Sequence, residues 1–244
     1  DIDAIFKSYD IRGLHPEQID PDTCALIGYG FACFLDEECD LNSVSGGKII
    51  VGFDMRPSSE SLADAFTSTV RYMGFDVISL GLCSTDMLYF ASGHLSAPGA
   101  IFTASHNPAE YNGMKLCKAN AVPIGEGSGL ERIRSFAKNW GSETVEKNIN
   151  YGPPGELQEL DILEDFVNHV VGFVDVDNLK AFRVVADTAN GMGGLVVPAV
   201  FEKIPPTVDI LYGELDGTFP NHPADPLNPE NLTDLAAITS IYRP

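Results

Sequence analysis

The pattern of apolar and polar residues predicts a buried strand followed by an amphipathic helix in the first third of the chain. An apolar run at residues 48–53 ends at Asp54 and a loop of proline and serine, which is typical of a buried strand that leads into a helix. The helix is predicted to begin at Ser58 or Ser59 and to end at Gly74. Its apolar face holds Leu62, Phe66, Val70 and Met73.

Four further elements are predicted around this strand and helix. They are a helix with Asp20 as its N-cap that runs to about Glu38, a strand at residues 76–80, a helix capped by Thr85 and a strand at residues 100–103. Because strands and helices alternate along the chain, we expect the strands to pair in parallel within an α/β layer architecture.

The alternation breaks at residues 151–155, where two glycines and two prolines precede an acidic stretch. We predict a domain boundary here, which divides the chain into residues 1–152 and 153–244. Beyond it, the sequence predicts an amphipathic helix at residues 157–171 and a strand at residues 183–187.

The strand at residues 183–187 ends in an acid, Asp187, as the earlier strand ends in Asp54. The interval between these two aspartates nearly equals the interval from Gly81 to Gly213, which close the next strand in each region. Such spacing is expected for a duplicated α/β unit, although any two α/β domains have strands and helices at partly similar intervals.

Composition excludes several classes of partner. Hydrophobic residues make up 44% and charged residues 20% of the chain, as in a globular protein, and the net charge of −20 opposes binding to nucleic acid or an anionic membrane. No apolar run is long enough to span a membrane and no N-terminal signal is visible, so we expect a cytoplasmic location. The cysteines lack metal-site spacing and are expected to be reduced thiols; they are Cys24, Cys33, Cys39, Cys83 and Cys117.

A polar loop at residues 103–115 (TASHNPAEYNGMK) follows a predicted buried strand. Strand ends are where open α/β sheets bind ligands, so Ser105 is a candidate nucleophile, and an ordinary turn rich in Ser and Asn is the alternative. Pro108 and Gly113 are expected to fix the path of the loop. Its two asparagines, Asn107 and Asn112, can bond the backbone locally.

His106 follows Ser105 directly and is not expected to form a catalytic triad with it, because adjacent side chains in an extended loop point apart. A second candidate is Arg12 in residues 6–13 (FKSYDIRG), whose planar fork suits a phosphate. The alternative for Arg12 is a surface salt bridge of small energetic value.

These stretches occur in an order that resembles the α-D-phosphohexomutases, in particular the bacterial phosphomannomutase/phosphoglucomutase branch. The matching segments are YDIRG at 9–13, TASHNP at 103–108, YNGMK at 111–115, DTANG at 187–191, FPNHP at 219–223 and PLNPENL at 226–232. The resemblance extends over nearly all of residues 5–237. It implies an α/β fold with two successive three-layer α/β/α domains and mixed sheets, the second domain being incomplete.

The resemblance implies that Ser105 carries a phosphoryl group, which it exchanges with a hexose phosphate through a bisphosphate intermediate. It further implies that Arg12 and Lys115 act in proton transfer and charge stabilisation. Tyr9, His106 and Asn107 are implied to line the substrate pocket, with His106 and Asn107 also shaping the loop. Mg²⁺ would bind the phosphate on Ser105, and glucose 1,6-bisphosphate would be the activator.

The chain departs from the family pattern after about Ala237. The family's DGDGDR-type loop, which supplies the aspartate ligands of Mg²⁺, is absent, as are the two domains that would complete the site. The expectation is therefore an N-terminal portion of a mutase that is inactive alone. The alternatives are a non-catalytic phosphosugar-binding or regulatory module and a serine-dependent, phosphatase-like hydrolase.

Overall fold

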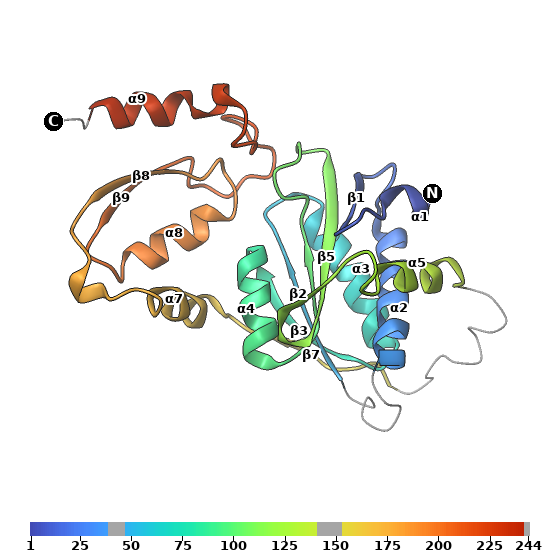
Figure 1. Ribbon diagram of the computed structural model, residues 1–244. Coiled ribbons are helices and arrows are strands. Elements are labelled where there is room, and N and C mark those ends of the chain that lie inside the picture. The colour runs from blue at the N-terminus through green and yellow to red at the C-terminus, as the bar shows by residue number, and fades with distance from the viewer. Residues whose placement is uncertain (39–46, 141–152, 242–244) are drawn as a thin grey trace. The chain divides into compact units, whose positions relative to one another are not determined.

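The structure, a computed structural model, describes residues 1–38, 47–140 and 153–241 (Figure 1). Its contacts divide the chain into two compact units. The first unit comprises residues 1–54, 58–104 and 110–161, and the second comprises residues 55–57, 105–109 and 162–244. Within the described ranges, no helix has both the length and the apolar character that a membrane span requires.

Among its described residues, the first unit is built on a seven-stranded mixed sheet with the order β1-β5-β4-β2-β3-β7, with β6 paired to β5. Strands β4, β2, β3 and β7 pair in parallel, whereas β1, β4 and β6 each pair antiparallel with β5. The strands are β1 (Ile11–Leu14), β2 (Lys48–Phe53), β3 (Asp76–Leu82), β4 (Gly99–Phe102), β5 (Tyr111–Lys118), β6 (Val122–Ile124) and β7 (Leu157–Glu159). The predicted strands at residues 48–53, 76–80 and 100–103 are thereby confirmed within a residue or two.

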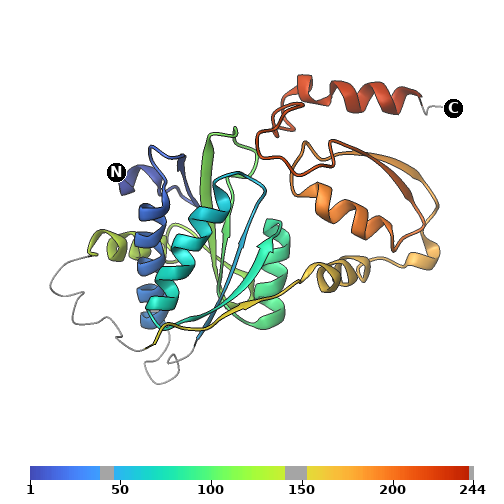
Figure 2. The same ribbon diagram turned by 180° about the vertical axis from the view of Figure 1, so that it is seen from behind.

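Helices cover both faces of this sheet, which gives the first unit three layers. Helices α2 and α3 lie on one face and α4 lies on the other, as the two opposite views show (Figures 1 and 2). The helical elements are α1 (Ile2–Ile5), α2 (Pro21–Glu38), α3 (Ser59–Tyr72), α4 (Thr85–Leu95), η1 (Ala119–Ala121) and α5 (Leu130–Lys138). The predicted α/β fold with a mixed sheet is confirmed for this unit.

The core of the first unit lies between the sheet and the α2–α3 layer. Three aromatic rings from different elements are fully buried there, with 5.9 Å between the centroids of Phe31 and Phe66 and 5.5 Å between those of Phe66 and Phe102. The predicted apolar face of α3 is confirmed, since Leu62, Phe66 and Val70 are all fully buried. Tilted and edge-on ring contacts of this kind add to the stabilisation from area burial alone.

Of the two N-cap residues predicted from the sequence, one is confirmed and one is wrong. Asp20 Oδ1 accepts a hydrogen bond from Thr23 N at 2.7 Å, so Asp20 caps α2 as predicted. The prediction that Thr85 caps α4 is wrong, because the N-cap is Ser84, whose hydroxyl accepts from Met87 N at 3.2 Å. Both residues have suitable side chains, and the hydroxyl of Ser84 is the one that satisfies a free N–H of the first turn.

The second unit contains a two-stranded parallel sheet among its described residues, formed by β8 and β9. Helix α8 connects the two strands, so the predicted recurrence of strand, helix and parallel strand is confirmed. The elements are α7 (Leu163–Val171), η2 (Val176–Asn178), β8 (Arg183–Asp187), α8 (Gly193–Phe201), β9 (Thr207–Leu211), η3 (Pro229–Leu232) and α9 (Thr233–Ile241).

The predicted helix at residues 157–171 is only partly correct. Its second half is α7, but Leu157–Glu159 forms β7, which pairs in parallel with β3 and therefore belongs to the first unit. Residues 157–159 form backbone hydrogen bonds with the edge of β3. This pairing with a distant strand outweighs the helical periodicity of the local sequence. The predicted boundary at residue 152 lies outside the described residues and stays a prediction, whereas the contacts divide the chain between Asp161 and Ile162.

The described cysteines are free thiols, as predicted: they are Cys24, Cys33, Cys83 and Cys117, whereas Cys39 lies outside the described residues. Burial raises the pKa of the Cys83 thiol to about 12. Such thiols remain protonated and act as small apolar side chains of the core.

Candidate functional site

Two of the predicted cations are held together in the first unit by a carboxylate. Arg12 lies on β1 and Lys115 on β5, and the two strands are paired so that Arg12 is opposite Gly113. Asp10 Oδ2 accepts from Arg12 Nη2 at 2.7 Å and lies 3.4 Å from Lys115 Nζ. The Asp10 side chain is only 9% exposed, whereas those of Arg12 and Lys115 are 29% and 27% exposed. One buried carboxylate thus orients two cations that still face solvent.

The salt bridge anticipated as an alternative for Arg12 is therefore present. It does not use up the guanidinium, because a single carboxylate oxygen contacts one of its nitrogens. An arginine has five N–H donors, and the partly exposed side chain keeps donors available for an anion. Asp10 was not among the predicted site residues, although its position two residues before Arg12 is a signal for such a pair.

Tyr9 lies in the tight turn that precedes β1, and its side chain is largely solvent-exposed, with a relative exposure of 83%. The turn is closed by a bond from Lys7 N to Asp10 O at 2.9 Å and by a bridge between Phe6 and Ile11. An exposed aromatic ring on a rigid turn is suited to contact a ligand, and this is the role predicted for Tyr9.

The start of β5 is fixed by the completely buried side chain of Asn112. Its Oδ1 accepts from Gly113 N at 2.7 Å, and its Nδ2 donates to the hydroxyls of Ser58 and Ser59 at 2.8 and 3.0 Å. Ser59 in turn donates to Asp54 Oδ1 at 2.6 Å. The predicted local backbone bond of Asn112 is confirmed, and the network ties the start of β5 to the start of α3.

Gly113 has no room for a side chain. A Cβ atom at this position would lie 2.1 Å from the Ile11 carbonyl oxygen, so any larger residue would push β1 away from β5. Glycine is thus required where the strands that carry Arg12 and Lys115 approach one another.

Ser105, His106 and Asn107 form the tip of the loop between β4 and β5, and Ser105 and His106 are exposed. Ser105 has a positive φ of 55°, so the backbone is not extended at this residue. Its Oγ lies 3.5 Å from His106 Nδ1, so the expectation that the two side chains point apart is wrong. The loop is not extended at Ser105, and at the outer limit of hydrogen-bond distance this contact is weak.

The carbonyl oxygens of this loop are bound by a residue that the sequence analysis missed. Arg56 Nη1 donates to Pro108 O at 2.7 Å, and Arg56 Nη2 donates to Asn107 O at 2.7 Å and to Ser105 O at 3.0 Å. Arg56 is 2% exposed, and its guanidinium lies over the Phe219 ring at 5.1 Å from the centroid. A basic residue two positions after the strand-ending Asp54, in a chain so poor in bases, was the available signal.

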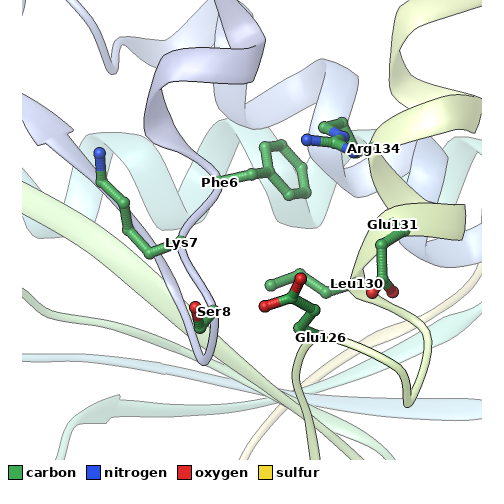
Figure 3. Close-up of a pocket in the computed structure, with 7 residues that line it drawn as sticks. All are labelled: Phe6, Lys7, Ser8, Glu126, Leu130, Glu131 and Arg134. Atoms are coloured by element: carbon green, nitrogen blue, oxygen red, sulfur yellow. The ribbon is translucent and has the colours of Figure 1, made fainter.

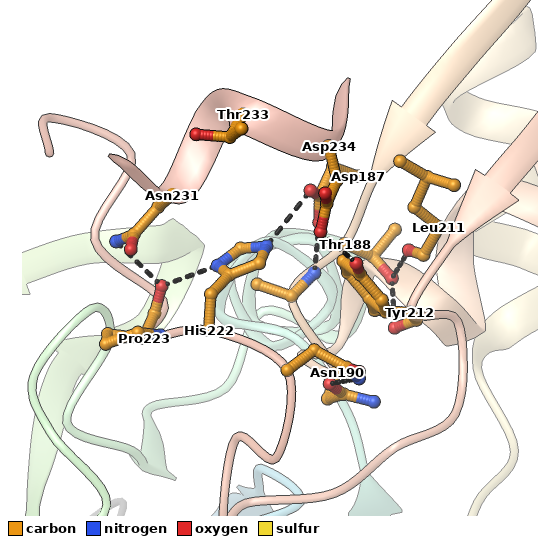
Figure 4. A network of polar contacts seen from close by, with 12 residues as sticks. Asp187, Thr188, Asn190, Leu211, Tyr212, His222, Pro223, Asn231, Thr233 and Asp234 are labelled. Atoms are coloured by element: carbon orange, nitrogen blue, oxygen red, sulfur yellow. Dashed lines mark hydrogen bonds and ion pairs between the residues drawn. The ribbon is translucent and has the colours of Figure 1, made fainter. Parts of the chain in front are cut away.

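A separate polar network surrounds His222 in the second unit (Figure 4). His222 Nε2 lies 3.0 Å from Asp187 Oδ2 and His222 Nδ1 lies 2.9 Å from Pro223 O, so both ring nitrogens face acceptors. Burial acts to lower the pKa of His222, but the Pro223 carbonyl and the Asp187 carboxylate outweigh it and the pKa is raised. Asp187 also accepts from Ala189 N at 2.9 Å, which shapes the turn after β8.

The first unit also contains a pocket of about 270 Å³ between the segment before β1 and the start of α5 (Figure 3). It is lined by Phe6, Lys7, Ser8, Glu126, Leu130, Glu131 and Arg134. None of the predicted site residues lines it. Its two acids and two bases give the pocket no single sign of charge that would select a phosphate.

The described side chains offer few ligands for a metal ion. No group of three His, Cys, Asp or Glu side chains that could hold a metal ion occurs within residues 1–38, 47–140 and 153–241. Magnesium is held in octahedral oxygen coordination, usually with one or two carboxylates, and Ser105 alone does not provide such a set. The described residues therefore do not fit a Mg²⁺ site by themselves.

Comparison with known proteins defines the class to which this fold and these residues belong. Residues 3–143 match the family model "Phosphoglucomutase/phosphomannomutase, alpha/beta/alpha domain I", and residues 164–241 match that of "alpha/beta/alpha domain II". The chain belongs to the phosphoglucomutase/phosphomannomutase family, which confirms the predicted resemblance and the two-domain fold.

Individual relatives agree with this assignment. A phosphomannomutase of Escherichia coli is 37% identical, and the match covers 95% of this chain and 49% of the relative. A phosphohexose mutase of Xanthomonas campestris pv. campestris is 35% identical, and the match covers 93% of this chain and 47% of the relative. A crystal structure of a phosphoglucomutase/phosphomannomutase family protein from Burkholderia thailandensis superposes with a TM-score of 0.82 at 28% identity, covering 96% of this chain and 49% of that chain. The chain thus spans about half the length of the relatives it matches.

Proposed function

We propose that this chain serves a phosphosugar mutase reaction, the interconversion of hexose 1-phosphate and hexose 6-phosphate, with Ser105 as the phosphoryl carrier. The proposal is carried by one observation: in a chain of this family, an exposed serine lies in the loop between β4 and β5. β5 carries Lys115, and its neighbour β1 carries Arg12.

The proposed reaction has two transfers. In the first, the Oγ–P bond of phosphorylated Ser105 breaks, the phosphoryl group bonds to a free hydroxyl oxygen of the hexose monophosphate, and the proton of that hydroxyl ends on Ser105 Oγ. In the second, the bond breaks between the sugar and the phosphate that the substrate first carried, this phosphoryl group bonds to Ser105 Oγ, and the proton that Ser105 gives up ends on the departing sugar oxygen. Such transfers depend on positioning and on neutralising charge on the transferred group.

Arg12 and Lys115 are proposed to supply that neutralisation and to assist the proton movements. Their geometry supports the role, because Asp10 holds both side chains while leaving donors of each exposed. Oriented donors that need no rearrangement stabilise developing charge more effectively than mobile ones. Tyr9, His106 and Asn107 are proposed to contact the sugar phosphate.

A phosphosugar-binding module without turnover is the second candidate. It is favoured by the lack of a three-residue metal-ligand group in the described ranges. Binding needs only the cations and the loop, whereas turnover needs the leaving charge to be compensated during transfer.

The test is to incubate the purified 244-residue chain with glucose 1,6-bisphosphate and to locate any phosphate by intact mass and peptide mapping. We expect phosphate on Ser105 and none after Ser105→Ala. Ser96→Ala is the matched control, because Ser96 is also an exposed serine with a positive φ, 51°. Stable phosphate on another serine would contradict the carrier role. Binding without transfer would favour the binding module, and release of inorganic phosphate would favour a hydrolase.

We further predict that the chain alone shows at most trace interconversion of hexose 1- and 6-phosphates. The reason is that the described residues supply too few ligands for a divalent cation near Ser105. A coupled mutase assay with Mg²⁺ and glucose 1,6-bisphosphate measures this directly. Robust turnover that is lost in Ser105→Ala would overturn the prediction while supporting the proposed carrier.

A further inference from the structure

We propose that Arg56 is the positioning residue of the loop that carries Ser105, and that it holds the backbone in the conformation from which Ser105 Oγ accepts and donates a phosphoryl group. The inference rests on the proposed function for its chemical meaning. Its structural part, that Arg56 fixes this loop, stands on the contacts of Arg56 alone.

The first support is the geometry of the guanidinium. Its two terminal nitrogens bind three carbonyl oxygens from four consecutive residues, namely those of Ser105, Asn107 and Pro108. The donor directions of a planar guanidinium are fixed, so three carbonyl groups of one loop can accept from it only if the loop backbone curves around it. The loop therefore takes its shape from Arg56, which is distant in sequence.

The second support is the backbone of Ser105 itself. A φ of 55° is sparsely populated for residues other than glycine, and such a conformation persists only where surrounding contacts impose it. The Ser105 carbonyl is one of the three acceptors of Arg56, so the imposed conformation and the bond that restrains it occur at the same residue. Hydrogen bonds from a charged donor are about twice as strong as those between neutral groups.

The third support is that Arg56 is itself held in place. Its guanidinium lies over the ring of Phe219, and Phe219 is 9% exposed. Gly217 approaches the backbone of Arg56 so closely that a Cβ atom there would lie 2.4 Å from Arg56 Cα. An arginine that is almost completely buried and packed on both backbone and side chain has little freedom to release its acceptors.

Lysine is a poor substitute at this position. Its ammonium group is a compact point charge and lacks the rigid fork that reaches three carbonyls in different directions. Arg56→Lys therefore keeps the charge but removes the geometry, whereas Arg56→Ala removes both. Arg71 is the matched control, because its Nε also donates to a backbone carbonyl, that of Gly155 at 2.8 Å, far from the loop in sequence.

The experiment has two arms on the 244-residue chain. Hydrogen exchange measured by mass spectrometry is compared for wild type, Arg56→Ala, Arg56→Lys and Arg71→Ala. We expect the amides of residues 105–107 to exchange at least about tenfold faster in Arg56→Ala, and less markedly faster in Arg56→Lys. Exchange in β4 and β5 should be unchanged in both, and Arg71→Ala should leave the loop as in wild type.

The second arm measures the rate of phosphate transfer from glucose 1,6-bisphosphate to Ser105. Arg56→Ala should lower the maximal rate at least about tenfold with little change in the donor concentration at half-maximal rate, because a misplaced nucleophile affects transfer more than binding. Added guanidinium ion at millimolar concentration should restore part of the rate in Arg56→Ala only. A merely structural role would give neither the selective loss nor the rescue.

The outcomes separate the two proposals. If wild type takes up no phosphate, the proposed function fails, and the exchange arm still decides whether Arg56 holds the loop. If loop exchange in folded Arg56→Ala equals that of wild type, the positioning role is refuted whatever the transfer rate. Should Arg56→Ala fail to fold, Arg56→Lys replaces it. If both the hydrogen exchange of the loop and the rate of phosphate transfer in Arg56→Lys equal those of wild type, the positioning role of the Arg56 guanidinium is refuted.

Discussion

The two units contain the same succession of strand, helix and parallel strand but bury it to very different degrees. In the first unit, Ile49 and Ile50 of β2 are completely buried, and α3 buries Leu62 and Phe66. In the second unit, β8 is only partly buried, and α8 buries none of its residues although its sequence, GGLVVPAVF, is almost wholly apolar. β2 has a strand on each side, whereas β8 pairs only with β9 in the described residues.

The difference shows that an apolar run predicts a strand or helix but does not determine what covers it. Burial of a strand depends on neighbours along both edges and on helices over both faces, which come from distant parts of the chain. The energetic consequence is that equal apolar sequences contribute unequal stability.

The strongest test replaces one leucine near the start of each connecting helix by alanine. Leu62→Ala in α3 should lower the free energy of unfolding of the first unit by about 3–5 kcal/mol, because the residue is fully buried and its removal leaves a cavity. Leu195→Ala in α8 should cost only about 1 kcal/mol. Both losses of stability are measured by urea-induced unfolding, with hydrogen exchange as the probe that reports on each unit separately. Equal losses would show that α8 is covered as well as α3.

A second test compares buried asparagines. Asn112→Ala should cost about 2–3 kcal/mol, because it removes three hydrogen bonds from a completely buried position. Asn231→Ala, which loses bonds to Pro223 O and Asp225 O, should cost about 1 kcal/mol in the less buried second unit. Thermal unfolding of the two variants gives the comparison. A larger loss in Asn231→Ala would reverse the proposed ranking of the units.

A third test concerns the cation pair of the first unit. Asp10→Asn should lower stability by about 1 kcal/mol, because Arg12 and Lys115 then repel each other without a carboxylate between them. The loss should shrink as sodium chloride is raised toward about 1 M, where charges are screened within a few ångström. Denaturant unfolding at two salt concentrations measures it. A loss independent of salt would indicate that packing, and not charge, is what Asp10 contributes.

The smallest effect is a pH dependence of the second unit. Because the pKa of His222 is raised above its ordinary value of 6.5, this group stabilises the unit fully below that value, and the contribution is lost as pH rises through the folded pKa. The groups that face the imidazole are Asp187, the Pro223 carbonyl and, beyond the Tyr212 ring, Asp234. We expect a change of about 1 kcal/mol or less, measured by hydrogen exchange at several pH values. His222→Gln should abolish it.

The elements of the first unit that are correctly predicted each carry a local signal in the sequence. The Asp20 cap, the face of α3 and the apolar run of β2 are signals of this kind, and the structure confirms them. The sequence predicts a helix at residues 157–159, whereas they form a strand through pairing with the distant edge of β3. Local periodicity contains no information about such an edge.

The residues of the candidate site also differ in whether a local sequence signal identifies them. Ser105, Arg12 and Lys115 occur in motifs and were found from sequence, although their roles stay predictions. Arg56 was missed because its meaning lies in three carbonyl contacts about fifty residues away. The close approach of Ser105 and His106 was missed because an extended loop was assumed where the backbone has a positive φ.

The charge of the group formed by Asp10, Arg12 and Lys115 affects how quickly an anion can associate with it. Together Asp10, Arg12 and Lys115 contribute a net charge of about +1 on a chain whose net charge is −20. A sugar phosphate approaching from bulk solution is therefore repelled until it is within roughly a screening length, about 8–10 Å, of the two cations. Association should accordingly become faster as ionic strength rises, the opposite of the behaviour of proteins that steer anionic ligands with a broadly positive surface.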